Sequence, residues 1–444
     1  MATYYVDPSG SNGTGTIGSP FNVLPANFSS AGYINGDIFL FKRGTTYTPA
    51  WTGAGGVAFT VNRAILFSDY GSGELPIIGS NFSGTGAGIL FRIFTSGCVF
   101  ENIMFQNIDL CHVLYVQSGI ADFVVRFCEF LNVARTTQAL VHNALTIGPG
   151  GALTGTVTIN GNTFDGVGND AMVVFCSGTI VISNNSIKNV SLDTTNGDNI
   201  SVSGDCALLR VFGNLCDHTN VDTKQCFIQD GGTVGLAEIF DNEFIGFFGV
   251  DSTQHTAVYL TIPGKIYRNK ISSWRSVVFC NGPNIEVSDN LILQGGGSAS
   301  TGAIWGASAG MVANGNTIVR VAGVELSNAA IRNTTSDASN IYKNNCIVGF
   351  GNGIRKGAAA VETNNLFSQV GTPVIDAAAA PVTPNASDIT ADPLLTSDYK
   401  PTATSPLLAA GTHLGYRRDI DGKQRQNPPC IGAYDAAPMR APLA

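Results

Sequence analysis

The most regular feature of the sequence is a repeated pattern of apolar and polar positions between residues 157 and 367. A run with apolar residues at alternate positions is followed by an asparagine, one further residue and usually another apolar side chain, as in VTINGNTF from Val157 to Phe164. The asparagines stand at nine positions: Asn162, Asn185, Asn214, Asn242, Asn269, Asn290, Asn316, Asn345 and Asn365. Their spacing of 20 to 29 residues is typical of solenoid repeats, and strand-forming residues without helical periodicity fill each unit. The pattern predicts an all-β solenoid.

A parallel β-helix is the solenoid that fits this pattern best. In such a coil each rung contains about three short strands, and equivalent residues of successive rungs stack at roughly 4.8 Å. An asparagine that recurs at a bend between two strands can adopt left-handed backbone angles and can bond its amide to the asparagines above and below. We therefore interpret the nine asparagines as a structural ladder rather than as a catalytic feature.

The repeat region is flanked by a different kind of sequence on each side. Residues 1–80 are expected to form an N-terminal cap with the first rungs and residues 81–370 the rungs of the coil. Residues 371–444, where Pro, Ala and Thr become frequent, should form a C-terminal cap. The ends of a solenoid are open strand edges and need such covers. No linker rich in Pro, Ser or Gly divides the repeats, so one structural domain is expected.

Composition narrows the classes of function. Charged residues make up 13% of the chain and glycine contributes 53 of 444 residues, which suits buried strands and tight turns. The net charge of -8 argues against a nucleic-acid partner, since phosphate binding needs a basic surface. No apolar run of about 18 residues is present, so membrane insertion is not expected. The ten cysteines lack a Cys-x-x-Cys spacing, which favours buried free thiols over a disulfide framework.

Localisation stays open on these grounds. No charged segment followed by an apolar stretch begins the chain, so a secreted protein would have had its leader removed. Free thiols instead favour assembly in a reducing compartment, as for a phage virion.

Motifs near both ends carry a resemblance to a known group of proteins. They are Tyr4-Tyr-Val6, Ser9-Gly10, Ser19-Pro-Phe21 and Gly36-Asp37 at the start, and Asp392-Pro-Leu394, Asp419-Ile-Asp-Gly422 and Ile431-Gly-Ala-Tyr-Asp435 at the end. With the rungs between them, these motifs resemble the right-handed parallel β-helix family of polysaccharide lyases, glycoside hydrolases and phage tailspike depolymerases. The resemblance implies a single-stranded right-handed coil with caps at both ends. It also implies a groove along one sheet, often for uronate-containing or bacterial surface polysaccharides. The motifs mark the fold, not catalytic residues.

The groove is expected along the strand that follows the variable loop of each rung, because loops around one sheet form the binding surface of a solenoid. These strands are predicted at residues 171–174, 200–203, 226–229, 258–261, 277–279, 303–305, 324–326 and 354–355. Tyr259 and Trp305 should face outward and could stack on sugar rings, although loops often cover such aromatics. Arg275 and Arg355 are the candidate cations for substrate binding.

Acidic residues concentrate in the middle of this surface. The candidate catalytic residues are Asp205, Asp230, Asp251, Asp222, Lys224 and His255. Asp205 and Asp230 are expected to end neighbouring groove strands, with backbones about 5 Å apart. Glycoside hydrolysis needs one protonated and one ionised carboxyl group, about 5 Å apart for retention or about 6.5–9.5 Å for inversion. The alternative is that these acids keep a coil of low charge soluble, pair with Lys224 or cap turns, and that His255 is a polar loop residue.

Three functions follow from these residues, each with a polysaccharide as the partner. We favour hydrolysis over β-elimination on a uronate glycan, because carboxylates outnumber bases. A lyase would use Lys224, His255 or Tyr259 as its base and Arg210, Arg275 or Arg355 as its cation. The third possible function is glycan binding without catalysis, by an adhesin or a phage tailspike. The resemblance implies a monomer for a lyase and a homotrimer for a tailspike.

No metal site has a recognisable spacing, and Ca²⁺ is the one candidate cofactor. Calcium bound by Asp193, Asp198 and Asp205 would neutralise a substrate carboxylate, but these positions match no calcium-loop motif.

Overall fold

The computed structural model describes residues 1–29, 31–49, 56–135, 142–149, 154–175, 177–192, 197–219, 225–232, 235–246, 256–272, 276–294, 302–321, 329–415 and 418–435. The chain divides into two compact units, Met1–Gly235 (unit 1) and Leu236–Ala444 (unit 2). Within these ranges the regular secondary structure consists of β-strands, and turns and loops connect them. The all-β parallel β-helix predicted from the repeats is confirmed in each unit.

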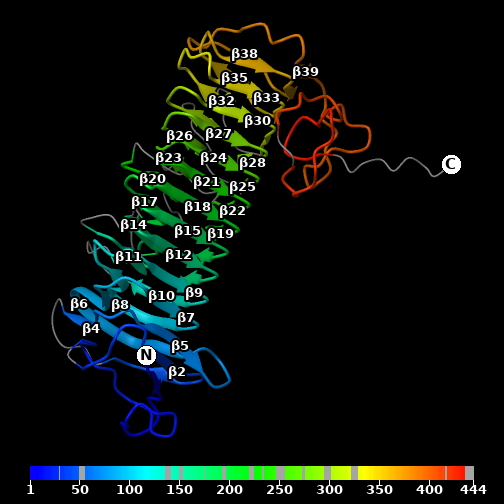
Figure 1. Cartoon of the computed structure of the whole chain (residues 1–444). Helices are drawn as coiled ribbons and strands as arrows, with labels where there is room; N and C mark the ends of the chain where they lie inside the picture. Colours follow the sequence, from blue (N-terminus) through cyan, green and yellow to red (C-terminus); the bar gives the residue numbers. More distant parts are fainter. Residues whose placement is uncertain are drawn as a thin grey trace. The chain divides into compact units, whose positions relative to one another are not determined.

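Strands of successive rungs pair in parallel and form three ladders in unit 1 (Figure 1). The first ladder contains β1 (Thr3–Val6), β2 (Ile38–Lys42), β5 (Leu66–Tyr70), β7 (Cys98–Glu101), β9 (Phe123–Arg126), β12 (Thr156–Asn160), β15 (Thr179–Ser183) and β18 (Leu208–Phe212). The second contains β3 (Thr46–Tyr47), β10 (Glu129–Arg135), β13 (Thr163–Asp165), β16 (Ser186–Lys188) and β19 (Leu215–Asp217). The third contains β4 (Val57–Val61), β11 (Leu145–Ile147), β14 (Met172–Phe175), β17 (Asp198–Ser203) and β20 (Gln225–Asp230). The long strands β6 (Ile77–Ile93) and β8 (Met104–Val116) belong to both the second and the third ladder.

Unit 2 repeats this arrangement with shorter strands. Its first ladder contains β21 (Ala237–Phe240), β24 (Gly264–Tyr267), β27 (Ile285–Ser288), β30 (Val312–Asn314), β33 (Ile341–Lys343) and β36 (Val361–Thr363). The second contains β22 (Glu243–Ile245), β25 (Lys270–Ser272), β28 (Leu291–Gln294), β31 (Thr317–Arg320), β34 (Cys346–Val348), β37 (Leu366–Ser368) and β39 (Ile389–Thr390). The third contains β23 (Thr256–Leu260), β26 (Ser276–Cys280), β29 (Ile304–Gly306), β32 (Ala329–Asn333), β35 (Asn352–Lys356) and β38 (Thr372–Ile375).

Alternate residues of each strand fill the interior of the coil. In β12, for example, Val157 and Ile159 are fully buried. Aromatic rings stack along the axis of unit 1, where the rings of Phe130 and Phe164 lie 4.7 Å apart at an interplanar angle of 4°. The described residues contain no helix with the length and apolar character that a membrane span requires.

The asparagine ladder predicted from the repeats is present in both units. In unit 1 the Asn162 amide donates to Asn185 Oδ1 (2.9 Å), and the Asn185 amide donates to Asn214 Oδ1 (2.9 Å). In unit 2 the same bond, 3.0 Å at each step, joins Asn242, Asn269, Asn290, Asn316, Asn345 and Asn365 in turn. All nine side chains are buried. The ladder thus satisfies polar groups at one inner corner of the coil.

The left-handed residue at this corner precedes the ladder asparagine, so the expectation that the asparagine itself adopts left-handed angles was wrong. The preceding residues are Gly161, Asn184, Gly213, Asp241, Arg268, Asp289, Gly315, Asn344 and Asn364, with φ between 54° and 67°. Glycine, asparagine and aspartate tolerate this region best, and Arg268 is the exception among the nine. The left-handed residue makes the bend, and the next residue holds the bend by its amide bonds.

The C-terminal segment folds back onto the side of unit 2, as its orange-to-red trace shows in Figure 1. Leu407 and Ile431 pack against Leu366 of the second ladder. Arg425 forms a buried ion pair with Asp289, which directly follows β27, and also donates to the carbonyl oxygens of Gly432 and Ala433. The segment is therefore fixed by both apolar packing and a buried charge pair.

Candidate functional site

Five outward side chains of the third ladder in unit 2 lie in one column. Tyr259 pairs in register with Phe279, Phe279 with Trp305, Trp305 with Arg332, and Arg332 with Arg355. Each is partly exposed, whereas the residue before each of them in the sequence is fully buried. This is the period-two alternation of a strand with one face in the core. We call this set the aromatic–arginine column. Figure 1 shows its strands β23, β26, β32 and β35 following one another along unit 2.

The three rings of the column contact one another. The Phe279 and Trp305 rings are stacked, with centroids 4.3 Å apart and an interplanar angle of 14°. The Tyr259 ring meets Phe279 edge to face at 5.1 Å, and its hydroxyl oxygen accepts a hydrogen bond from the Asn281 side chain (2.8 Å). Neighbouring rungs stand about 4.8 Å apart, so the rings form a continuous aromatic strip across three rungs. Such a strip presents apolar ring faces beside polar groups.

Two arginines continue the column on the next two rungs. The Arg332 guanidinium lies 5.6 Å from the centroid of the Trp305 ring, in a cation–π arrangement. Burial and the positive charge of Arg355 lower the pKa of Arg332. Arg355 donates from Nη2 to the carbonyl oxygen of Ala377 (2.6 Å), and its buried Nε has no hydrogen-bond partner. The two like charges on adjacent strands repel each other.

The predicted pairing of Asp205 with Asp230 in unit 1 was wrong. Asp230 ends β20 and pairs in register with Ser203, whose hydroxyl donates to Asp230 Oδ1 (2.8 Å). Strand β17 ends at Ser203 because Gly204 adopts a φ of 98° and turns the chain. Asp205 therefore lies beyond the strand, exposed at the surface. Asp205 therefore belongs to the turn after β17 and not to a strand of the ladder.

Several predicted residues lie outside the described part of the chain. They are Asp193, Asp222, Lys224, Asp251, His255 and Arg275. Arg210, the other candidate cation of a lyase, belongs to β18 of the first ladder and lies over the ring of Phe212 at 5.5 Å. The described residues bring together no group of three or more His, Cys, Asp or Glu that could hold a metal ion.

Comparison with known proteins identifies the fold. No family model matches the chain, and no curated protein matches its sequence. A solved structure of XylC in complex with xylose superposes with a TM-score of 0.53 at 9% identity and covers 98% of each chain. Pectate lyase Pel9A and a rhamnogalacturonan lyase, both at 13% identity over 98% of this chain and 97% of theirs, give TM-scores of 0.36 and 0.34. XylC shares the β-helix fold. At this identity the roles of individual residues must come from the geometry of this chain.

The column contains two residues that the sequence did not single out. Phe279 ended a predicted groove strand, and its outward direction could have been read from the buried Val278 before it. Arg332 was missed because the groove strand of its rung was placed at residues 324–326, outside the described part, whereas the strand is β32. Tyr259, Trp305 and Arg355 were predicted as substrate-binding residues, and the structure places all three in the column.

A second polar feature, in unit 1, has no sequence signature. At the start of the third-ladder strands, the backbone N–H of Asn143 donates to His112 Nδ1 (3.1 Å), and the N–H of Asp198 donates to Asp170 Oδ1 (2.5 Å). Burial and the nearby His142 lower the pKa of His112 to about 3. Burial raises the pKa of Asp170 to about 7, although the two hydrogen bonds that it accepts act in the opposite direction. These side chains act as turn caps, and Asp170 stays protonated close to neutral pH.

Proposed function

We propose that the protein binds an acidic polysaccharide along the aromatic–arginine column of unit 2 and, as a separate part of the proposal, that it cleaves glycosidic bonds of such a polysaccharide. The observation that carries the proposal is the register of three aromatic and two cationic side chains on consecutive rungs. The fold is shared with XylC, which was solved with xylose, and this agrees with a carbohydrate ligand. The acidic character of the ligand is inferred from the two arginines.

The aromatic strip suits a sugar chain because C–H groups of a pyranose face can pack on aromatic rings while the hydroxyl groups stay in water. Tyr259 and Trp305 are two strand spacings apart, which corresponds to about 10 Å. An extended glycan can therefore contact more than one ring. Phe279 and Trp305, whose rings are stacked, should contribute most to this contact.

The arginines supply selectivity for charge. A guanidinium binds a carboxylate through two parallel hydrogen bonds, and an anion between Arg332 and Arg355 would remove the repulsion of their adjacent charges. The Arg355 side chain is partly exposed, so a ligand can reach its guanidinium from solvent. A uronate carboxylate has the charge and shape that this end of the column requires.

Cleavage is proposed by a carboxylate mechanism, with β-elimination as the alternative. Asp230, which ends β20 of unit 1 and accepts a hydrogen bond from the Ser203 hydroxyl (2.8 Å), is the candidate nucleophile or general base. Asp222, which also belongs to unit 1, is the candidate for the protonated partner, and Asp251 is a separate catalytic candidate in unit 2. In β-elimination, Tyr259, Lys224 or His255 would remove the proton beside the uronate carboxylate, and an arginine would stabilise the developing charge.

Binding is tested by calorimetric titration with polygalacturonate and with a neutral polysaccharide of similar length. Trp305→Ala should weaken binding about tenfold, because the loss of one stacked ring removes about 1–2 kcal/mol. Arg332→Gln and Arg355→Gln should weaken binding of the acidic polymer and lower its dependence on salt. The matched control is Phe94→Ala in unit 1, whose ring is 47% exposed and lies outside the column. Equal affinity of the wild type, Trp305→Ala and the two arginine variants would contradict the proposal.

Cleavage is tested separately, by mass spectrometry of the products. Oligosaccharides that have gained water indicate hydrolysis, and Asp230→Asn should then lower the rate by about a hundredfold or more. Unsaturated fragments indicate β-elimination. In that case Tyr259→Phe is the variant to test, and it should lower the rate of cleavage. A polymer that binds to the column but stays intact would show an adhesin and would refute cleavage alone.

A further inference from the structure

A cavity of about 290 Å³ lies on the first ladder of unit 2, away from the strands that carry the aromatic–arginine column. Glu238, Lys265 and Glu286, from β21, β24 and β27, pair in register and line the cavity. Lys265 Nζ is 3.7 Å from Glu286 Oε2. Charges of alternating sign therefore follow one another across three rungs.

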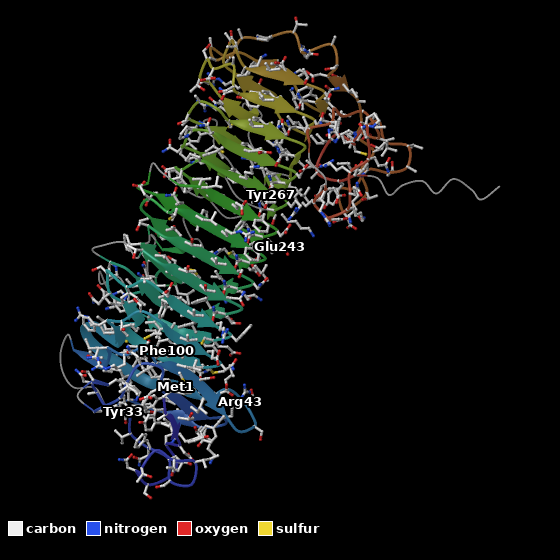
Figure 2. All side chains as sticks on the ribbon, in the orientation of Figure 1. Met1, Tyr33, Arg43, Phe100, Glu243 and Tyr267 are labelled. Atoms are coloured by element: carbon white, nitrogen blue, oxygen red, sulfur yellow. The ribbon has the colours of Figure 1, made fainter. Side chains whose placement is uncertain are left out.

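A change in side-chain size explains why the ladder is hollow here. Tyr267 lies in register between Phe240 on one side and Ser288 on the other, and all three belong to the same face of the ladder. The rings of Phe240 and Tyr267 stack at 5.0 Å with an interplanar angle of 7°. Ser288 cannot fill the equivalent space on the next rung, so space remains beside the tyrosine. Figure 2 labels Tyr267 on the side of unit 2 where the C-terminal segment lies.

The C-terminal segment completes the cavity with a cation. Arg418 lines it and donates from Nη1 to the carbonyl oxygen of Gly422 (2.9 Å). Two other lining residues form ion pairs with residues that do not line it: Asp289 with Arg425, and Arg268 with Asp241. The described lining residues comprise three carboxylates, Glu238, Glu286 and Asp289, and three cations, Lys265, Arg268 and Arg418. The positive and negative charges around the cavity are therefore equal in number.

We propose that this cavity binds one neutral sugar residue, such as a free monosaccharide or the end of a glycan. Its volume lies at the lower end of small-ligand sites, which is enough for one ring but not for a chain. Carboxylates accept hydrogen bonds from sugar hydroxyls, cations donate to the oxygens, and the Tyr267 ring offers an apolar face. A balanced set of charges favours neither an anion nor a cation. The site does not depend on the proposed polysaccharide function of the column.

Saturation-transfer NMR and calorimetry on the full-length protein test the site with glucose, galactose, mannose and xylose as probes. Glucuronate and glucosamine serve as charged counterparts. A ligand of this size should bind with a dissociation constant on the order of millimolar. Glu238→Gln and Glu286→Gln keep the shape of the side chain but remove its charge, and each should weaken binding about tenfold. Glu129→Gln in unit 1 is the matched control and should bind as the wild type does.

Arg418→Ala provides a second, independent variant, because Arg418 is exposed and its loss leaves the coil intact. It should also weaken binding, with thermal unfolding unchanged. The proposal is overturned if no neutral monosaccharide saturates the wild type at about a hundred times the expected constant. It is equally overturned if the glutamine variants bind unchanged, or if a charged sugar binds better than every neutral one. Binding of polygalacturonate to the column is measured on the same samples, so that failure of one site can be separated from failure of the other.

Discussion

Replacement of Asn290 by alanine would remove one step of the asparagine ladder in unit 2. The Asn290 amide donates to the carbonyl oxygens of Ile266 (2.9 Å) and Ser288 (3.0 Å) and to Asn316 Oδ1 (3.0 Å). Its Oδ1 accepts from the backbone N–H (2.9 Å) and the side-chain amide (3.0 Å) of Asn269. The side chain is fully buried, so water cannot replace these partners.

The size of the effect follows from the groups that lose a partner. The backbone N–H of Asn269 would be buried without an acceptor, at a cost of about 1–3 kcal/mol. The bonds to Ile266, Ser288 and Asn316 contribute less, since the Asn316 side chain still accepts from the Asn290 backbone N–H (3.1 Å). We expect the free energy of unfolding to fall by about 3 kcal/mol, which is large for a single substitution.

The assay is denaturant unfolding combined with hydrogen exchange. Exchange of the Asn269 amide should be faster in Asn290→Ala than in the wild type, because this amide loses its acceptor. Asn290→Asp keeps the acceptor but places a carboxylate against two carbonyl oxygens, so it should be at least as destabilising. Asn385→Ala is the matched control: Asn385 is exposed and accepts bonds only within its own turn, and its loss should cost less than about 1 kcal/mol. A loss for Asn290→Ala no greater than that of this control would refute the reasoning.

Two further predictions concern titration and the C-terminal segment. Native Asp170 keeps its proton up to about pH 7, whereas the unfolded chain releases it near 3.8. Between these values the native state binds more protons, so the free energy of unfolding should fall as pH rises, by at most about 1.4 kcal/mol per pH unit. Asp170→Asn should remove this part of the pH profile, and parallel profiles of variant and wild type would contradict it. Arg425→Met should destabilise unit 2 by about 3–5 kcal/mol, since it leaves the buried Asp289 carboxylate without its cation. Asp289→Asn in the same chain should restore part of the loss, and equal melting of the single and double variants would argue against a buried charge as the cause.

The sequence alone predicts the features in which the same amino acid recurs at the same position of each rung. The ladder asparagines recur in every rung of the repeat region, so their stacking followed from the period alone. Tyr259, Trp305 and Arg355 could be placed outward because apolar residues alternate on the same strands. The left-handed position was misplaced by one residue, since Gly, Asn, Asp and Arg268 share no single letter there.

Other features depend on contacts that no local pattern encodes. The register of Asp230 depends on where β17 ends, and a single turn at Gly204 sets this. The turn caps at His112 and Asp170 come from separate rungs and use different residue types. The pair of Arg425 and Asp289 joins positions 136 residues apart, and only the folding back of the C-terminal segment brings them together.

The coil separates the inward residues that hold it together from the outward residues that are partly exposed. The asparagine amides and the buried apolar rows stabilise each rung from the inside, so the outward positions of the third ladder are not needed to fill the interior. Two arginines on adjacent rungs add repulsion, which costs stability, and burial adds to this by lowering the pKa of Arg332. The cation–π contact of Arg332 with Trp305 and the hydrogen bond from Arg355 to the carbonyl oxygen of Ala377 offset part of this cost. The proposed acidic ligand would offset more of it, because its carboxylate would lie beside both positive charges.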